Sequence, residues 1–320
     1  MRLALGDLYT SPDHYLHSFD ADNAIVVPMD RAAYHRSIFL DGRISPAAGQ
    51  AMALPVAALA QGTRAPQPTS WIFHMAHVGS TLLARALDDP EASLVLREPL
   101  ALRQVAIQPD DQRLAIVAAM LGKRYRADAP TLVKANVPVN FMLPKLTAID
   151  PNARAILLYL PLRDYLLAIL RSDSHRNWLR NVTAFLAPYL GDLSASSDAE
   201  RGAALWLAQV DAFAGALAAM PNACALNAEQ FFAEPEAVLN AAAAHLAVPI
   251  GPAAIAATVA GPLFASNAKN PTLAFDNRQR IARRDDLQCS MSAELDAAQQ
   301  WIRRRADAAE AALAAAALSQ

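Results

Sequence analysis

The chain has 320 residues, of which 54% are hydrophobic and 18% charged, a composition typical of a globular protein that can bury a sizeable core. Its formal net charge is −2, which argues against the general positive field that binding of nucleic acid or of an anionic membrane requires. Any anion-binding site therefore has to be local. Two cysteines without metal-ligand spacing, Cys224 and Cys289, argue against a disulfide framework and a structural zinc, and favour a reducing cytoplasm.

No segment predicts a membrane span or a secretion signal. The most apolar run, residues 155–170, is interrupted by Pro161, Arg163 and Asp164. Near the N-terminus, Asp7 comes too early for the apolar part of a signal peptide. We therefore expect a cytoplasmic protein that binds neither membrane nor nucleic acid.

Residues 1–68 are expected to form an N-terminal α+β extension. A polar, proline-bearing linker at 61–68 separates this extension from residues 69–320, the predicted main domain. The expected elements of the extension are a short strand at 24–28 and helices at 31–39 and 45–60.

From Ser70 onward, short apolar runs alternate with segments of helical periodicity. This alternation predicts an α/β fold, in which a parallel sheet is sandwiched between helices, followed here by a C-terminal helix. In such sheets, ligands bind at the carboxyl ends of the strands. The predicted strands are residues 71–75, 93–96, 131–134, 154–159 and 223–226. The predicted helices are residues 80–88, 111–124, 164–172, 174–190, 199–219, 235–246 and 292–316.

The connection between the strand at 71–75 and the helix after it predicts a phosphate-binding loop. The strand is followed by a short turn with Gly79, and then by the hydroxyl pair Ser80 and Thr81 at the start of the helix. The N–H groups of such a turn converge, the helix start adds partial positive charge, and the hydroxyls donate hydrogen bonds. A tight turn that binds no ligand is the alternative.

The loop differs from the Walker A sequence of ATP-binding P-loops. His74 takes the place of the first glycine, and Ser80 takes that of the lysine. No predicted strand ends in the aspartate that holds Mg²⁺ in P-loop ATPases. Ordinary ATP hydrolysis and kinase chemistry are therefore disfavoured, although a divergent P-loop kinase stays open as an alternative.

Residues 74–88 resemble the 5′-phosphosulfate loop of the sulfotransferases, in which a glycine is followed by a pair of hydroxyl residues. The resemblance implies a P-loop fold that uses 3′-phosphoadenosine 5′-phosphosulfate (PAPS) as sulfuryl donor and needs no metal. The candidate donor-binding residues in the loop are His77, Val78, Gly79, Ser80, Thr81 and Leu82.

The same resemblance gives His77 a candidate catalytic role. His77 stands where that family has Arg or Lys, and Val78 stands where it has a small residue. A protonated His77 would donate a hydrogen bond to the bridging or leaving oxygen. A purely structural hydrogen bond of His77 is the alternative.

Glu98 is the candidate general base. The strand at 93–96 runs into a charged turn with Arg97 and Glu98. Resemblance to the protein-tyrosine-type and bacterial carbohydrate-type sulfotransferases implies that Glu98 deprotonates the acceptor hydroxyl. For this role we expect partial burial to raise the pKa of Glu98. A surface ion pair between Arg97 and Glu98 is the alternative.

Two lysines are further candidates. Lys134 ends the strand at 131–134 and therefore lies at the same sheet edge as the loop, where it would neutralise charge on the donor or substrate. The alternative is a surface lysine whose stem lies along the protein. Lys269 lies in the polar, loop-like stretch 266–272, and the resemblance implies that such a late loop closes the donor site. The basic residues of 274–284 are expected on a solvated helix face.

The segment 154–172 occupies the place of the family's 3′-phosphate segment. With Asp164 aligned on the family's Asp, Leu160 and Ala168 stand where the family has Arg and Ser. Three explanations stay open: a donor other than PAPS, a phosphate held by other residues, or a loss of activity. Asp164 itself is expected to cap a helix. Basic and hydroxyl residues occur close by in a shifted register, namely Arg163, Arg171 and Ser172, and Arg163 and Ser172 are candidate donor-binding residues.

Three functions remain open at this point. The leading hypothesis is a sulfotransferase-like enzyme that transfers a sulfuryl group from PAPS to a hydroxyl or amine of a small-molecule or glycan acceptor. The second is a non-catalytic protein of the same fold that binds a nucleotide or another anion. The third is the divergent P-loop kinase.

Overall fold

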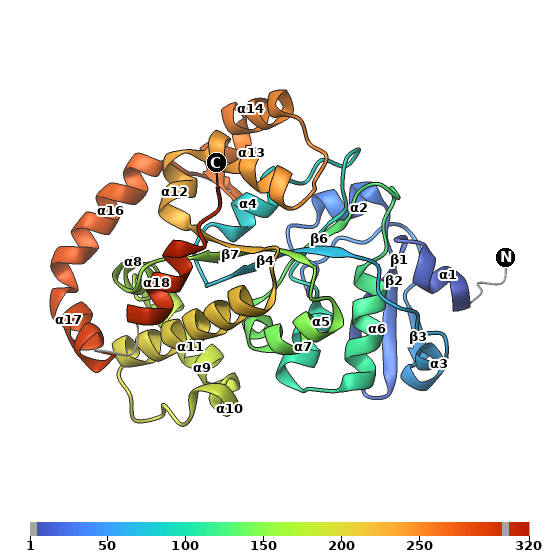
Figure 1. Cartoon of the computed structure of the whole chain (residues 1–320), viewed down its shortest axis with the longest axis horizontal. Coiled ribbons are helices and arrows are strands. Elements are labelled where there is room, and N and C mark those ends of the chain that lie inside the picture. Colours follow the sequence, from blue (N-terminus) through green and yellow to red (C-terminus); the bar gives the residue numbers. More distant parts are fainter. Residues whose placement is uncertain (1–4, 303–306, 320) are drawn as a thin grey trace.

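The computed structural model of the chain describes residues 5–302 and 307–319. At its centre lies a parallel sheet of five strands in the order β5-β6-β4-β7-β8 (Figure 1). The strands are short apolar runs of mostly buried residues, and each overlaps a strand predicted from the sequence, so the parallel α/β fold is confirmed. Their bounds are β4 Thr69–His74, β5 Val95–Arg97, β6 Thr131–Lys134, β7 Arg154–Tyr159 and β8 Ala223–Asn227.

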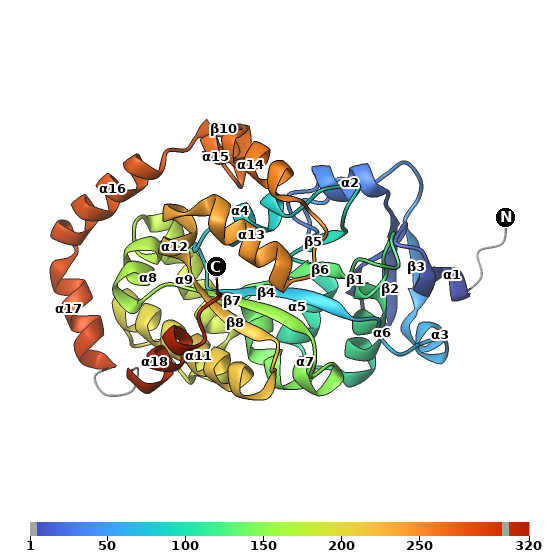
Figure 2. The ribbon, with the colours of Figure 1, turned by 45° about the horizontal axis from the view of Figure 1, so that its top comes forward.

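Helices cover both faces of this sheet. The first group, which covers one face in Figures 1 and 2, comprises α4 (Ser80–Ala86), α12 (Ala228–Ala233), α13 (Pro235–His245) and α14 (Pro252–Ala260). The second group covers the other face and comprises α5 (Leu100–Ile107), α6 (Asp111–Leu121), α7 (Leu143–Ile149) and α11 (Asp198–Ala219). The remaining helices between β4 and residue 270 are η1 (Val137–Met142, a 3₁₀ helix), α8 (Leu162–Ile169), α9 (Asp173–Phe185), α10 (Ala187–Leu190) and α15 (Pro262–Ala265). Helix α5 was not expected, since it starts after Pro99 without a capping side chain.

The N-terminal segment forms a small antiparallel sheet in the order β1-β2-β3. The helix expected at 45–60 is wrong, because Met52–Pro55 pairs with β2 as a strand and only Val56–Gln61 is helical. Pro55 explains the division, since a proline inside a helix lacks the N–H for its hydrogen bond. The elements of this segment are α1 (Leu5–Thr10), β1 (His14–Asp20), β2 (Asn23–Pro28), α2 (Arg31–Arg36), β3 (Met52–Pro55) and α3 (Val56–Gln61).

Arg97 joins the N-terminal segment to the central sheet. Its side chain is 1% exposed and forms an ion pair with Asp88. The surface ion pair of Arg97 with Glu98 considered above is therefore wrong, because the Arg97 side chain lies inside the protein. The guanidinium also donates to four main-chain carbonyl groups at the end of α2, those of Tyr34, His35, Ser37 and Ile38.

The C-terminal part wraps around one end of the molecule as an arc of helices (Figures 1 and 2). The loop expected at 266–272 is instead a hairpin of two short strands. Of the helix expected at 292–316, residues 303–306 lie outside the described part, and two helices occupy the rest. The elements here are β9 (Ser266–Asn267), β10 (Asn270–Ala274), α16 (Asn277–Ser290), α17 (Ser292–Trp301) and α18 (Asp307–Ala315).

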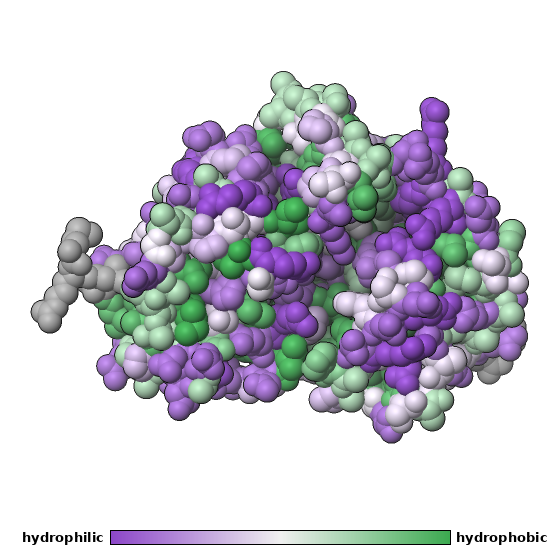
Figure 3. All heavy atoms as spheres, turned by 180° about the vertical axis from the view of Figure 1, so that it is seen from behind, coloured by the Kyte–Doolittle hydropathy of each residue, from purple (hydrophilic) through white to green (hydrophobic). Residues whose placement is uncertain are grey.

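One described helix, α11, is long and apolar enough to span a membrane by length and composition alone. Half of its most apolar window is buried inside the fold, where it packs against α7, α8, α9, α17 and α18. On the face that Figure 3 shows, hydrophobic and hydrophilic side chains are intermingled. The apolar character of α11 is thus explained by its place in the core.

Candidate functional site

A cavity of about 960 Å³ lies at the carboxyl edge of the parallel sheet. Its lining follows the strand order, with Glu98 after β5, Asn136 after β6, His77 after β4, Asp164 after β7 and Glu229 after β8. The loop between β4 and α4 therefore lies in the middle of the cavity. We call the part toward β5 the β5 half and the part toward β8 the β8 half.

The loop between β4 and α4 presents its backbone and hydroxyls to the cavity. Gly79 has a φ of 79° and begins α4, and no side chain caps this helix. The first N–H groups of α4 thus have no side-chain acceptor. Ser80, Thr81 and Leu82 line the cavity, and the buried Thr81 Oγ1 has no hydrogen-bond partner among the residues that the structure describes. Val78 is fully buried and does not line the cavity.

Phe232 of α12 lies directly against this loop. A Cβ atom placed on Gly79 would come within 2.7 Å of the Phe232 ring, so the glycine permits a close contact. The Arg280 guanidinium lies over the same ring, 4.2 Å from its centroid. The Phe275 ring lies 6.2 Å from that of Phe232. The β8 half therefore contains two aromatic rings beside a cation.

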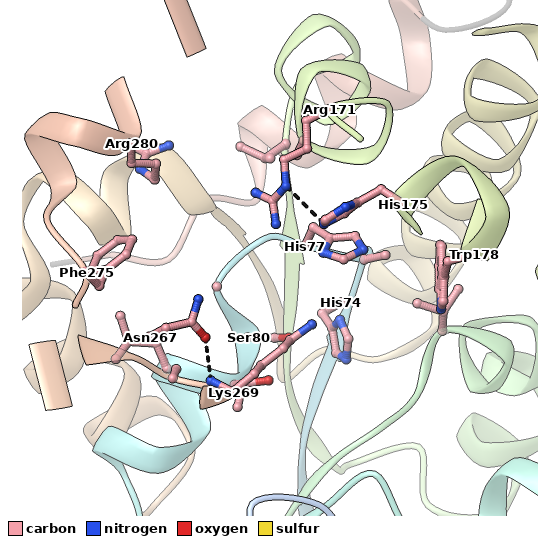
Figure 4. A pocket seen from close by; sticks show the side chains of 18 of the residues that line it. His74, His77, Ser80, Arg171, His175, Trp178, Asn267, Lys269, Phe275 and Arg280 are labelled. Atoms are coloured by element: carbon pink, nitrogen blue, oxygen red, sulfur yellow. Dashed lines mark hydrogen bonds between the residues drawn. The ribbon is translucent and has the colours of Figure 1, made fainter. Parts of the chain in front are cut away.

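His77 is neutral at pH 7. Burial, and next the nearby Lys269 ammonium, lower the pKa of His77 to about 2. Its ring lies 4.5 Å from that of His175 and meets Trp178 edge-on at 5.6 Å (Figure 4). A protonated His77, as considered from the sequence, is therefore ruled out near neutral pH, and the ring has a single N–H to donate.

His74 has a structural role at the end of β4. Its Nδ1 lies 2.7 Å from the Met75 carbonyl oxygen, and its Nε2 lies 2.7 Å from that of Ala135. Burial lowers the pKa of His74 to about 3, so the neutral ring donates to one of these two oxygens. The ring thereby links the ends of β4 and β6 beneath the loop.

Glu98 and Lys134 form an ion pair in the β5 half. Lys134 Nζ bonds to Glu98 Oε1, and Asn136 Nδ2 lies 3.4 Å from Glu98 Oε2. Burial opposes ionisation of Glu98, but the charge of Lys134 and the bond from Lys134 outweigh it, so the pKa of Glu98 is lowered. The expected rise is therefore wrong. Lys134 is 0% exposed, which also excludes the surface lysine considered above.

Three cations that line the cavity have no carboxylate partner among the described residues. Within the described part of the chain, neither Arg171, Lys269 nor Arg283 forms an ion pair. The Lys269 side chain extends toward Ser80 and His74 (Figure 4). Enclosure in the cavity, and next the charge of Lys134, lower the pKa of Lys269 to about 8. Burial and Arg283 lower the pKa of Arg171. An anion among these three side chains would relieve their mutual repulsion.

His175 orients one of these cations. Arg171 Nε donates to His175 Nε2 at 3.0 Å (Figure 4). His175 Nδ1 lies 2.6 Å from Ser172 Oγ. Burial and Arg171 lower the pKa of His175 to about 4, so its ring is neutral and carries its proton on Nδ1. Ser172 thus acts through His175 and does not itself line the cavity.

The segment after β7 differs from the expectation in two ways. Asp164 lies in the first turn of α8 and accepts no capping hydrogen bond, and burial and Glu229 raise its pKa. Arg163 does not line the cavity, since its guanidinium contacts Asp296 and Gln299 of α17.

Sequence reasoning missed the contribution of α16 to the cavity. Arg280 forms a two-bond ion pair with Glu229, and Arg284 contacts both Glu229 and Asp164. Arg283 lies between them in sequence and lines the same cavity. The helical spacing of these arginines with Leu287 was the available signal, because positions i, i+3, i+4 and i+7 share one face.

Fold and site define an α/β protein whose cavity, at the carboxyl edge of the parallel sheet, is lined by more basic than acidic residues. No protein-family model matches the chain, and no curated protein matches it. A sulfotransferase domain from the curacin biosynthetic pathway is similar with 14% identity and a TM-score of 0.40, over 66% of this chain and 84% of that one. A sulfotransferase from Alicyclobacillus acidocaldarius is similar with 14% identity and a TM-score of 0.38, over 76% and 99%. At these values of identity and TM-score, the similarity does not assign a function to any individual residue of this chain.

Proposed function

We propose that this protein is a sulfotransferase-like enzyme that transfers a sulfuryl group from PAPS to a hydroxyl or amine of a small-molecule or glycan acceptor. The observation that carries the proposal is the group of unpaired cations, Arg171, Lys269 and Arg283, which line the same cavity as the loop between β4 and α4. A phosphosulfate is an anion that suits this group. The uncapped N–H groups of α4 and the unpartnered Thr81 hydroxyl add donors beside it.

The nucleoside part of the donor fits the β8 half. Phe232 and Phe275 offer flat apolar faces for a base, and Arg280 lies over one of them. A 3′-phosphate would need Arg280 or Arg284 to exchange its carboxylate partner for phosphate, because both are paired with Glu229. Binding of the 3′-phosphate is therefore the most demanding part of the proposal.

The acceptor then lies in the β5 half, beside Glu98. Its oxygen attacks the sulfur, the bond from sulfur to the bridging phosphate oxygen breaks, and Glu98 takes the hydroxyl proton. The carboxylate is ionised at neutral pH, because its pKa is lowered, and so it is able to accept that proton. Lys134 holds it in place, and Lys269 stabilises negative charge that develops on the leaving phosphate. Metal independence and a cytoplasmic location are parts of the same proposal.

Calorimetry with the desulfonated donor, 3′-phosphoadenosine 5′-phosphate, tests the donor site. We expect binding in EDTA that weakens with salt, and weaker binding of AMP, which lacks the 3′-phosphate. Lys269→Met should reduce the affinity about tenfold or more, because it removes a charge-assisted contact. Lys145→Met is the matched control, since Lys145 is an exposed lysine of α7 that pairs with Asp111 outside the cavity.

The outcomes separate the three functions. Equal affinities for AMP and for 3′-phosphoadenosine 5′-phosphate would contradict the assignment of PAPS as the donor. Binding of ATP that requires Mg²⁺ would favour the divergent kinase. Donor binding without transfer of labelled sulfate to a broad set of acceptors would favour the non-catalytic protein.

A further inference from the structure

The β5 half of the cavity contains one arginine whose charge nothing neutralises. Arg103 of α5 lines the cavity and is partly buried, and within the described residues its guanidinium makes no hydrogen bond and no ion pair. Burial opposes ionisation of Asp41, but Arg43 and, to a smaller extent, the charge of Arg103 lower its pKa. Asp41 already forms an ion pair with Arg43, so it does not serve as the partner of Arg103.

The other charges of the β5 half cancel in pairs. Arg43 donates to Asp41 through Nε at 2.9 Å and Nη2 at 2.6 Å, a two-bond contact. Glu98 is paired with the fully buried Lys134. Arg103 therefore leaves an excess positive charge in the cavity that the predicted base also lines.

Much of the remaining lining of the cavity is apolar. The Arg43 guanidinium lies over the Phe39 ring, 3.7 Å from its centroid, and this cation–π contact helps to hold the Arg43 side chain in place. Apolar side chains of α5, η1 and α9 also line the cavity, namely Ile107, Val137, Pro138, Trp178, Val182 and Phe185. Phe185 is 56% exposed, so the apolar lining reaches the surface. A ligand that fits must combine an apolar body with a negative charge.

We propose that the acceptor is an organic hydroxy acid with an apolar or aromatic body, and that Arg103 binds its anionic group. The negative group pairs with Arg103, the body lies between α9 and η1, and the hydroxyl is directed to Glu98. Arg103 is well placed for this, because α5 begins two residues after Glu98 and Arg103 lies in its first turn. This assignment rests on the proposed function for the role of the hydroxyl, whereas recognition of the anion depends on the cavity alone.

Two probes that differ in one group test the proposal. 4-Hydroxyphenylacetate carries a carboxylate, and 2-(4-hydroxyphenyl)ethanol has an alcohol in its place. We expect the protein to bind the acid at least about tenfold more tightly than the alcohol in calorimetry, the usual strength of one charge-assisted contact. A third probe, 4-hydroxybenzenesulfonate, distinguishes preference for a carboxylate from preference for a sulfonate.

Arg103→Gln should bring the ratio of the two affinities close to one and leave the affinity for the alcohol unchanged. Arg126→Gln is the matched control, because Arg126 pairs with Asp128 on the surface outside the cavity. Equal affinities in the native protein, no detectable binding of the acid, or an unchanged ratio in Arg103→Gln overturns the proposal. The affinities of the probes are measured both without and with 3′-phosphoadenosine 5′-phosphate. A failure of the protein to bind the donor is therefore distinguished from a failure to bind the acid.

Discussion

Lys134 holds Glu98 through both its main chain and its side chain. The Glu98 N–H donates to the Lys134 carbonyl oxygen at 2.8 Å, and the Glu98 carboxylate accepts a bond from Lys134 Nζ. The φ of Glu98 is 57°, a left-handed conformation that residues other than glycine adopt at a cost. The ends of β5 and β6 are thus joined at the cavity, and the direction of the carboxylate is determined.

Removal of Lys134 should destabilise the protein strongly. Lys134→Met leaves an ionised, mostly buried carboxylate without its cation, and we expect a loss of about 3 kcal/mol in the free energy of unfolding. Urea titration of the purified variant measures it. Glu98→Gln should cost less, because the amide keeps a hydrogen bond to Lys134. A loss in Lys134→Met no larger than in Lys145→Met would contradict the expectation.

The contribution of Glu98 to stability should depend on pH. Its pKa is lowered in the folded state from its ordinary 4.5, because Lys134 outweighs burial. The stabilisation is therefore present above pH 4.5 and is lost as the pH falls through the lower, folded-state value. The stability difference between native protein and Glu98→Gln should shrink on acidification. A difference that stays constant from neutral to strongly acidic pH would sink this prediction.

Anion binding should weaken as the pH rises above neutral. Lys269 has a pKa lowered to about 8, and only its protonated form attracts an anion. A bound anion raises that pKa, so the affinity for 3′-phosphoadenosine 5′-phosphate should start to fall near pH 8 and level off above the raised value. Lys269→Arg should bind without this decline, because arginine stays charged. Parallel pH profiles of the two proteins would refute the role of Lys269.

Alanine substitutions at Gly79 and Gly191 should distinguish the energetic cost of a steric clash from that of backbone strain. Both have a positive φ, 79° and 77°, but a Cβ would meet the Phe232 ring at Gly79 and nothing within 4 Å at Gly191. At Gly79 the ψ is 6°, so alanine there adopts the left-handed helical conformation at a backbone cost of about 1 kcal/mol. At Gly191 the ψ is −177°, a region almost exclusive to glycine, so alanine there should cost about 1–3 kcal/mol through its backbone alone. The clash with Phe232 should add about 1–3 kcal/mol in Gly79→Ala. Thermal unfolding measures both losses, and a loss of only about 1 kcal/mol in Gly79→Ala would show that Phe232 yields freely.

The N-terminal segment should be required for folding of the rest. Without residues 1–68, the buried Arg97 loses its carbonyl acceptors at the end of α2, and a buried charge that keeps only Asp88 is costly. We expect a chain of residues 69–320 to lack cooperative unfolding by circular dichroism. A fragment that unfolds cooperatively would establish the predicted boundary as one between independent units.

The strands were predictable because a parallel sheet covered by helices is buried on both faces. The runs at Thr131–Lys134 and Arg154–Tyr159 are therefore short and almost wholly buried. The helix expected at 45–60 failed for the opposite reason. Its alanines favour a helix locally, but β2 supplied an edge with which Met52–Pro55 pairs.

The sequence by itself determined the parallel sheet, the place of the loop at Gly79 and the polar residues that follow each strand, because these depend on local periodicity and on the chirality of strand–helix connections. Only the tertiary structure decided the charge states of the titratable residues in the cavity and which of these residues pair with one another. Burial makes His77 neutral, Lys134 ionises Glu98, and folding brings Arg171, Lys269 and Arg283 together from segments far apart in sequence. Electrostatic energies depend on distance and desolvation in space, and a linear pattern contains neither.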